Sequence, residues 1–454
     1  MFKKDFVWGA ATSAYQIEGA AYADGKGLTI WDTFCKKDGV IFDGHSGDDA
    51  CEHYYRYKED VALMKQVGLR AYRLSLSWAR ILPSGTGAVN PKGIEFYNNL
   101  IDELLKNGIT PYITLYHWDL PLELYHKGGW LNRESADWFA EYARIAVTNF
   151  GDRVKHFMTF NEPQVAVGMG FASGIHAPGL KMAPSETVRM THNILLAHGK
   201  AVKAMREIAP DLKIGIVPVN IFSYPEIETP ENIALARKLS FDMIDHPTDW
   251  FFSAAWWGDP VMFGKYPEDG LKRFGQWLPD GWERDMETIK QPIDFYGPNF
   301  YEGRAVQVSA SENNGYTTKR FRYPGCPKTA FNWPITPEGL KWAAIFLHER
   351  YKLPIYIMEN GLSCHDVISL DGKVHDPNRI DYLNRHLLAL REAAESGADV
   401  AGYFQWSLLD NFEWASGYSE RFGLVYVDFT TQQRIIKDSG HWYRGVIESN
   451  GENL

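Results

Sequence analysis

The chain has 454 residues, 45% of them apolar, so it is long enough to bury a large hydrophobic core. Its 57 Asp and Glu outnumber its 47 Lys and Arg, and no cluster of cations offsets the net charge of −10. We therefore expect neither nucleic acid nor an anionic membrane surface as a partner. No apolar run approaches the ~18 residues that a membrane-spanning helix needs.

The sequence predicts no metal site and no cofactor. The four cysteines, Cys35, Cys51, Cys326 and Cys364, lack C-x-x-C spacing, and His, Cys and Asp form no ligand set. Buried free thiols in a reducing compartment are the expected state. Residues 6–17 contain Trp, Thr, Ser, Tyr and Gln instead of the aliphatic core of a secretory signal. A cytoplasmic protein is therefore predicted.

Short segments rich in β-branched and aromatic residues alternate along the chain with segments of helical periodicity. Strands are predicted at residues 6–18, 71–78, 110–117, 154–163, 213–219, 293–301, 355–358 and 400–407. Helices are predicted at residues 54–67, 93–106, 132–150, 192–208, 230–246, 337–350 and 379–396. Gly68 is expected to cap the first helix at its C-terminus, and Asn132 the third at its N-terminus.

The alternation of strands and helices predicts an α/β fold with a parallel sheet. Eight such units favour a single (β/α)8 TIM barrel with long βα loops, and residues 1–454 are expected to form one catalytic domain. Residues 302–332, rich in Gly, Ser, Asn and Pro, are predicted to be a long excursion and a candidate lid. A doubly wound sheet is the alternative, but no G-x-G-x-x-G or Walker motif supports it.

Two of the predicted strands end in a glutamate. Glu359 follows the apolar run 355–358, and Glu162 precedes Pro163, which has no N–H to continue a sheet ladder. Burying a carboxylate within a strand is costly, so both are expected at the carboxyl ends of the strands, where barrels place their chemistry. A surface glutamate before a turn is the alternative for Glu359. Paired carboxylates are the groups that glycoside hydrolysis uses.

The longest motif lies near the end of the chain. Residues 401–414 have the sequence AGYFQWSLLDNFEW, and the motif continues through Tyr418 to RFGL at 421–424. FVWGAA at 6–11, TFNEP at 159–163 and ENG at 359–361 precede it. With these motifs in this order over nearly its whole length, the sequence closely resembles glycoside hydrolase family 1, the β-glucosidase family.

The resemblance implies a retaining double displacement, with Glu359 as the nucleophile and Glu162 as the acid/base. Arg73 matches an arginine that hydrogen-bonds to the nucleophile, and a cation there would keep Glu359 ionised. The charge of Glu359 should in turn raise the pKa of Glu162. We expect the two carboxyl groups to lie about 5–5.5 Å apart, the retaining geometry.

The resemblance also assigns a set of sugar-binding positions. These are Gln16, His117, Asn161, Glu413 and Trp414 for the hydroxyls, Trp406 as a platform with Trp118 beside it, Asn299 and Tyr301 near the nucleophile, Trp333 for the aglycone, and Phe422 within the last motif. A structural histidine and a buried, hydrogen-bonded tyrosine are the alternatives for His117 and Tyr301. Met358, Phe300 and Gln405 depart from the usual family pattern, and these departures bear on fine specificity.

The expected activity is that of a retaining β-glucosidase. Its substrate would be a small-molecule β-glucoside with a terminal non-reducing β-D-glucosyl residue, such as cellobiose, a short cello-oligosaccharide or an aryl glucoside, as in cellulose degradation. Activity on β-galactosides or β-fucosides, and transglycosylation, are compatible with the same residues. The alternatives are a 6-phospho-β-glucosidase and a non-catalytic sugar-binding barrel. A carboxylate at Glu413 favours a free hydroxyl at C6 of the sugar and disfavours a 6-phosphate by repelling its charge. No particular oligomeric state is predicted.

Overall fold

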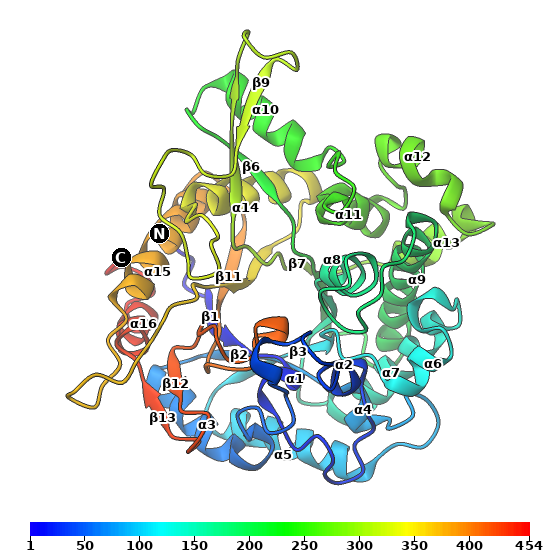
Figure 1. Ribbon diagram of the computed structural model, residues 1–454, viewed down its shortest axis with the longest axis vertical. Coiled ribbons are helices and arrows are strands. Elements are labelled where there is room, and N and C mark those ends of the chain that lie inside the picture. Colours follow the sequence, from blue (N-terminus) through cyan, green and yellow to red (C-terminus); the bar gives the residue numbers. More distant parts are fainter.

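The computed structural model describes all of residues 1–454. Eight parallel strands close into a barrel in which β11 pairs with β1, and helices surround it (Figure 1). In barrel order the strands are β1 (Val7–Ala11), β2 (Ala71–Ser75), β3 (Thr110–Tyr116), β4 (His156–Asn161), β5 (Lys213–Val217), β7 (Phe295–Tyr296), β10 (Ile355–Asn360) and β11 (Val400–Trp406). The predicted (β/α)8 barrel is confirmed.

The longer helices of the outer layer are α3 (His53–Val67), α5 (Pro91–Lys106), α7 (Ser135–Phe150), α9 (Pro184–Ile208), α10 (Pro230–Phe241), α14 (Pro337–Tyr351), α15 (Pro377–Glu395) and α16 (Asp438–Glu448). Shorter helices are α1 (Ala14–Ile17), α2 (Ile30–Phe34), α4 (Trp78–Ile81), α6 (Leu122–His126), α8 (Pro163–Val167), α11 (Ala254–Phe263), α12 (Glu268–Phe274) and α13 (Trp282–Ile289). No helix is long and apolar enough to cross a membrane.

Local sequence signals account for several helix ends. Gly68 adopts φ 79° after α3, the left-handed conformation expected of a C-terminal cap. Asn90 accepts a hydrogen bond from the backbone N–H of Lys92, and Pro91 begins α5. The cap predicted at Asn132 is displaced: its side chain accepts from the N–H of Glu134 in a turn that precedes α7.

Two predicted strands are much shorter than expected. The first ends at Ala11, and Ala14–Ile17 forms α1 instead. In the sixth, only Phe295–Tyr296 forms a regular ladder, because Pro298 has no N–H to donate. Beyond this proline the pairing resumes only as isolated bridges from Asn299 to Val219 and to Glu359.

The excursion predicted at residues 302–332 contains regular structure. Its strands β8 (Gly303–Val308) and β9 (Tyr316–Lys319) form an antiparallel hairpin, and β8 pairs in parallel with β6 (Phe222–Pro225). This three-stranded sheet is separate from the barrel and projects at the top of Figure 1. A second small sheet joins β12 (Val425–Val427) and β13 (Arg434–Ile436).

The hydrophobic core has two parts. A cluster of 10 buried residues draws at least one side chain from every barrel strand, Met358 and Phe404 among them, and so fills the barrel interior. A cluster of 110 buried residues occupies the space between the barrel and its outer layers. Cys35 and Cys51 are buried as predicted, whereas Cys326 and Cys364 are partly exposed, and all four thiols are free.

Candidate active site

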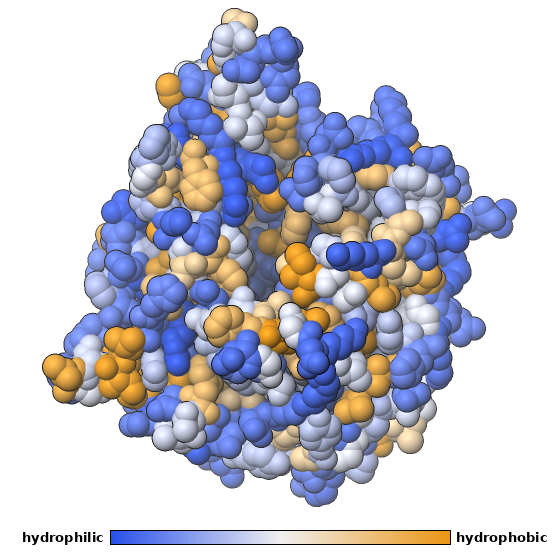
Figure 2. Space-filling view, viewed as in Figure 1, coloured by the Kyte–Doolittle hydropathy of each residue, from blue (hydrophilic) through white to orange (hydrophobic).

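A cavity of ≈ 500 Å³ opens at the carboxyl end of the barrel strands, within the hollow at the centre of Figure 2. The predicted site residues that line it are His117, Trp118, Glu162, Tyr301, Trp333, Glu359, Trp406, Glu413, Trp414 and Phe422. The other predicted site residues, Gln16, Arg73, Asn161 and Asn299, lie directly behind this lining and hydrogen-bond to it.

Glu359 lies near the carboxyl end of β10 and is 3% exposed. Arg73 Nη1 donates to its Oε1 at 2.6 Å, and the hydroxyl of Tyr301 donates to its Oε2 at 2.7 Å. Burial raises the pKa of Glu359, while Arg73 and Tyr301 oppose this rise because both stabilise the ionised carboxylate. Each oxygen of this carboxylate therefore has its own donor.

Arg73 is held rigidly within the barrel. It is fully buried on β2, and its remaining N–H groups donate to Thr114 Oγ1 at 3.1 Å, to the carbonyl of Met358 at 3.1 Å and to Asn161 Oδ1 at 2.6 Å. The partners come from β3, β10 and β4, three strands of the barrel. A planar guanidinium satisfies such a set of fixed acceptors better than an ammonium does.

Glu162 follows the last residue of β4 and immediately precedes α8. Its backbone adopts φ 42°, a left-handed conformation that is uncommon for a residue with a Cβ, and its N–H donates to the carbonyl of Val217. Its Oε1 accepts from Asn299 Nδ2 at 2.6 Å. The pKa of Glu162 is raised well above its usual range, first by burial and second by the charge of Glu359. The sequence predicted the direction but attributed it to Glu359 alone.

Asn161 connects the two carboxyl groups. Its Oδ1 accepts from Arg73 and, at 3.0 Å, from Asn299. Its Nδ2 donates to Nε2 of His117 at 3.1 Å, which makes Nδ1 the protonated nitrogen of that ring in the neutral state. Burial lowers the pKa of His117, so the imidazole is neutral.

Aromatic rings form one wall of the cavity. The ring of His117 stacks at a centroid distance of 5.8 Å on both Trp406 and Trp414, and Trp118 lies 4.5 Å from Trp414. Trp118 and Trp414 have φ of 77° and 50°. Together with Glu162, three residues of the cavity lining therefore adopt left-handed backbone conformations. Strained conformations of this kind are concentrated at functional sites.

Glu413 lies beside this wall. Gln16 Nε2 donates to its Oε2 at 3.4 Å and also to the side chain of Asn411 at 3.0 Å. Burial, together with the charges of Glu359 and Glu420, raises the pKa of Glu413 to about 8. This carboxyl is therefore mostly protonated at neutral pH.

Glu413→Gln is expected to make the stability less dependent on pH. The carboxyl titrates near 4.3 in an unfolded chain, and the folded protein raises its pKa to about 8. Unfolding therefore releases a proton between these values, and the free energy of unfolding falls by roughly 4 kcal/mol from about pH 5 to about pH 9. The amide introduced by Glu413→Gln does not titrate, so the variant lacks this fall in the free energy of unfolding. Thermal midpoints of the unaltered protein and of the variant, measured at both pH values, check this. If the two midpoints differed by the same amount at both pH values, the expectation would be contradicted.

Part of the lining was not predicted from the sequence. Phe331 stacks on Trp333 at a centroid distance of 4.9 Å, and Arg304, Arg320 and Glu302 also line the cavity. These residues come from the excursion that carries β8 and β9, where the sequence offered no motif. The position of Phe331 two residues before Trp333 was the one available signal.

A closed α/β barrel with two buried carboxyl groups at the carboxyl ends of its strands is the architecture of a glycoside hydrolase. The model of Glycosyl hydrolase family 1 matches residues 1–452. The chain belongs to glycosyl hydrolase family 1, as its motifs predicted.

Characterised relatives match over the full length. The 1,4-beta-D-glucan glucohydrolase of Thermotoga neapolitana is 49% identical over 99% of both chains. Beta-glucosidase A of Thermotoga maritima is 48% identical over 99% of this chain and 98% of its own. The structure of beta-glucosidase from Thermotoga maritima in complex with deoxynojirimycin has a TM-score of 0.90 at 47% identity and covers 99% of both chains.

Proposed function

We propose that this chain is a retaining β-glucosidase that removes terminal non-reducing β-D-glucosyl residues from small glucosides. The observation that carries the proposal is the unequal surroundings of its two buried glutamates. Glu359 is paired with the guanidinium of Arg73, whereas Glu162 receives only an amide N–H from Asn299. One carboxyl group is therefore suited to remain ionised and the other to remain protonated. The names of the full-length relatives support the same activity.

In the proposed first step, Glu162 donates its proton to the glycosidic oxygen. Because Oε1 of Glu162 accepts from Asn299, the proton belongs on Oε2. The bond between C1 and the glycosidic oxygen breaks, the aglycone leaves as an alcohol, and a carboxylate oxygen of Glu359 forms an ester bond to C1. Arg73 and Tyr301 hold Glu359 in place during the attack.

In the second step, water replaces the ester. The charge of Glu359 is lost while the ester exists, so the pKa of Glu162 falls and it is ionised after its proton transfer. Glu162 then accepts a proton from water, the water oxygen bonds to C1, and the ester bond breaks to restore Glu359. An acceptor sugar in place of water would give transglycosylation. Two displacements at C1 leave the anomeric configuration unchanged.

The glucosyl ring is proposed to occupy the side of the cavity formed by His117, Trp406 and Trp414. A pyranose presents apolar C–H faces and a ring of hydroxyls, and this wall combines aromatic faces with polar groups. Gln16 and Glu413 complete the hydroxyl contacts, while Trp333 and Phe422 line the side where the aglycone leaves. Trp118 belongs to the same wall, and its indole N–H donates at 3.1 Å to the carbonyl of Asn161, which lies behind it.

The sequence suggested that Glu413 would reject a 6-phosphate by charge repulsion. In the structure this repulsion is a weak argument. Since the pKa of Glu413 is about 8, its carboxyl is mostly neutral at pH 7. The remaining argument is that the two arginines of the cavity lining, Arg304 and Arg320, belong to the excursion and not to the segment that carries Glu413. Arg320 donates to Glu302 at 2.7 Å, and Arg304 faces Asp249 at 4.0 Å. We therefore propose ordinary glucosides as substrates.

The test compares initial rates on nitrophenyl β-glucoside with and without a 6-phosphate. The proposal predicts turnover of the plain glucoside and little of the phosphorylated one. Preference for the phosphorylated compound would assign a 6-phosphoglycosidase, and turnover of neither would favour a sugar-binding barrel. Proton NMR of the first product checks the mechanism, since retention releases β-glucose and inversion releases α-glucose.

We also propose that residues 1–454 act as one catalytic domain. The barrel strands run from Val7 to Trp406, so the site is incomplete without most of the chain. The cytoplasmic location, activity on β-galactosides or β-fucosides, and the carboxyl separation of about 5–5.5 Å stay predictions.

A further inference from the structure

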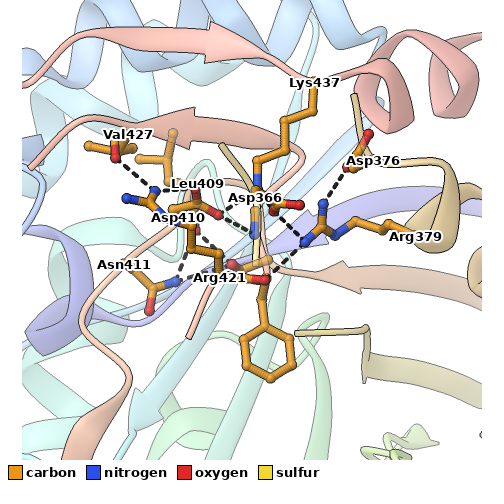
Figure 3. A network of polar contacts seen from close by, with 12 residues as sticks. Asp366, Asp376, Arg379, Leu409, Asp410, Asn411, Arg421, Val427 and Lys437 are labelled. Carbon is orange, nitrogen blue, oxygen red and sulfur yellow. Dashed lines mark hydrogen bonds and ion pairs between the residues drawn. The ribbon is translucent and has the colours of Figure 1, made fainter. Parts of the chain in front are cut away.

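Six charged side chains, five of them buried, form a chain of alternating sign (Figure 3). In order they are Arg421, Asp410, Lys437, Asp366, Arg379 and Asp376. The first four contacts measure 2.6, 2.6, 2.5 and 2.7 Å, and Arg379 also pairs with Asp376. None of the six lines the cavity.

Stability alone is a weak reason for such a network. Lys437 and Asp410 are fully buried, and desolvating charges can cost as much as their attraction returns, so apolar residues often serve stability equally well. Directed contacts between charges do, however, fix the relative positions of the segments that carry them. The question is therefore which segments Lys437 holds together.

Asp410 closes the loop that carries the proposed glucosyl contacts. Its Oδ2 accepts from Arg421 Nη1 at 2.6 Å, and its Oδ1 accepts from the backbone N–H of Gly423 at 2.9 Å. These bonds join the two ends of the loop from which Glu413 and Trp414 reach the cavity. We name residues 410–423 the glycone loop.

Asp366 lies on the other side of Lys437, in the loop that follows β10 and therefore follows Glu359. The two loops also touch directly: the carbonyl of Arg421 accepts from Cys364 N at 3.0 Å and from Arg379 Nη2 at 2.9 Å. Lys437 Nζ donates to both Asp366 and Asp410, so a single ammonium connects the loop after Glu359 with the glycone loop.

We propose that Lys437 is a positioning residue that sets Glu413 and Trp414 relative to Glu359 and thereby determines recognition of the glucosyl hydroxymethyl group. The proposal rests on the proposed function. Without the ammonium, Asp366 and Asp410 would face one another as like charges, and the glycone loop would move away from the loop after β10. Glu359 would keep its own contacts with Arg73 and Tyr301, so the chemical step itself would remain.

Lys437→Met tests the proposal, because it keeps the length of the side chain and removes its charge. The substrates are nitrophenyl β-glucoside and nitrophenyl β-xyloside, which has the same ring without the hydroxymethyl group. A displacement of about 1 Å can lower a rate by up to about 100-fold. We expect kcat/KM on the glucoside to fall by about 10–100-fold and on the xyloside by less than about threefold.

Arg350→Met is the matched control. Arg350 on α14 forms a bidentate pair with Asp259 on α11, on the outside of the barrel. Its loss should lower the thermal midpoint without changing the glucoside-to-xyloside ratio. If Lys437→Met lowered kcat/KM equally on both substrates, the glucoside-to-xyloside ratio would be unchanged. This result would overturn the proposal, because a purely structural residue affects both substrates alike.

Asp366→Asn provides a second variant if Lys437→Met fails to fold. It keeps the pairing of Lys437 with Asp410 and weakens the contacts that Asp366 makes with Lys437 and Arg379. The glucoside-to-xyloside ratio of kcat/KM should fall, as in Lys437→Met, but by a smaller factor. An unchanged ratio would again overturn the proposal. Failure of the proposed function is distinguishable, because it would appear as a lack of glucoside turnover in the unaltered protein.

Discussion

Glu359→Gln is expected to lower the hydrolysis of nitrophenyl β-glucoside by about 10⁵-fold or more, comparable to the loss of a catalytic nucleophile in other hydrolases. An amide oxygen does not form the ester bond to C1, so the first step has no route through this residue. The fold should be retained, since Arg73 keeps its bonds to Thr114, Asn161 and the carbonyl of Met358. The buried charge of Arg73 loses its carboxylate partner in this variant, so the thermal midpoint should fall.

The control for this variant is Glu302→Gln. Glu302 also lines the cavity, but it pairs with Arg320 and has no hydrogen bond to either proposed catalytic carboxyl group. Initial rates, circular dichroism and thermal midpoints should be measured on both variants. Near-normal activity of Glu359→Gln beside a folded spectrum would remove Glu359 from the mechanism.

Glu162→Gln is expected to have an effect that depends on the leaving group. A poor leaving group such as glucose needs a proton from Glu162, and general acid catalysis contributes about 10²–10⁴-fold. A dinitrophenolate leaves without a proton, so formation of the ester should continue at a nearly normal rate. The second step still lacks its base, so the ester accumulates and both kcat and KM fall.

Pre-steady-state kinetics on dinitrophenyl β-glucoside measures this directly. A burst of one dinitrophenolate per active site, followed by slow turnover, is the expected result. Cellobiose hydrolysis should fall by about 10²–10⁴-fold in the same preparation. An equal loss on both substrates without a burst would mean that Glu162 does not act as the acid/base.

The barrel was predictable because its strands and helices are encoded locally. Periodic apolar residues and caps such as Gly68 set the helices, and most of their boundaries lie within a few residues of the prediction. The errors occur where the chain leaves that regular pattern. Ala14–Ile17 turns into a helix directly after β1, and Pro298 interrupts the sixth barrel strand. The first departure involves a tertiary contact, in which the backbone N–H of Ala14 donates to Ser75 Oγ at 2.7 Å. The second follows from a proline that the sequence itself shows.

The proposed catalytic glutamates could be located from the sequence, whereas their electrostatics could not. Both lie at the ends of strands, where the motifs placed them. Burial is, however, a property of the folded surroundings, and it is the largest influence on the pKa of Glu162 and of Glu413. The sequence therefore predicted a charged Glu413 where the structure gives a mostly neutral one.

The separate sheet of β6, β8 and β9 has a consequence for how this fold can diversify. The proposed glucosyl contacts come from α1, from the ends of barrel strands and from the glycone loop, whereas Arg304, Arg320 and Phe331 of the cavity lining belong to the excursion at residues 302–332. These three residues thus have a scaffold of their own. Exchanging the excursion between homologues offers a modular route to new aglycone preferences that leaves the proposed catalytic residues intact, for engineers as for evolution.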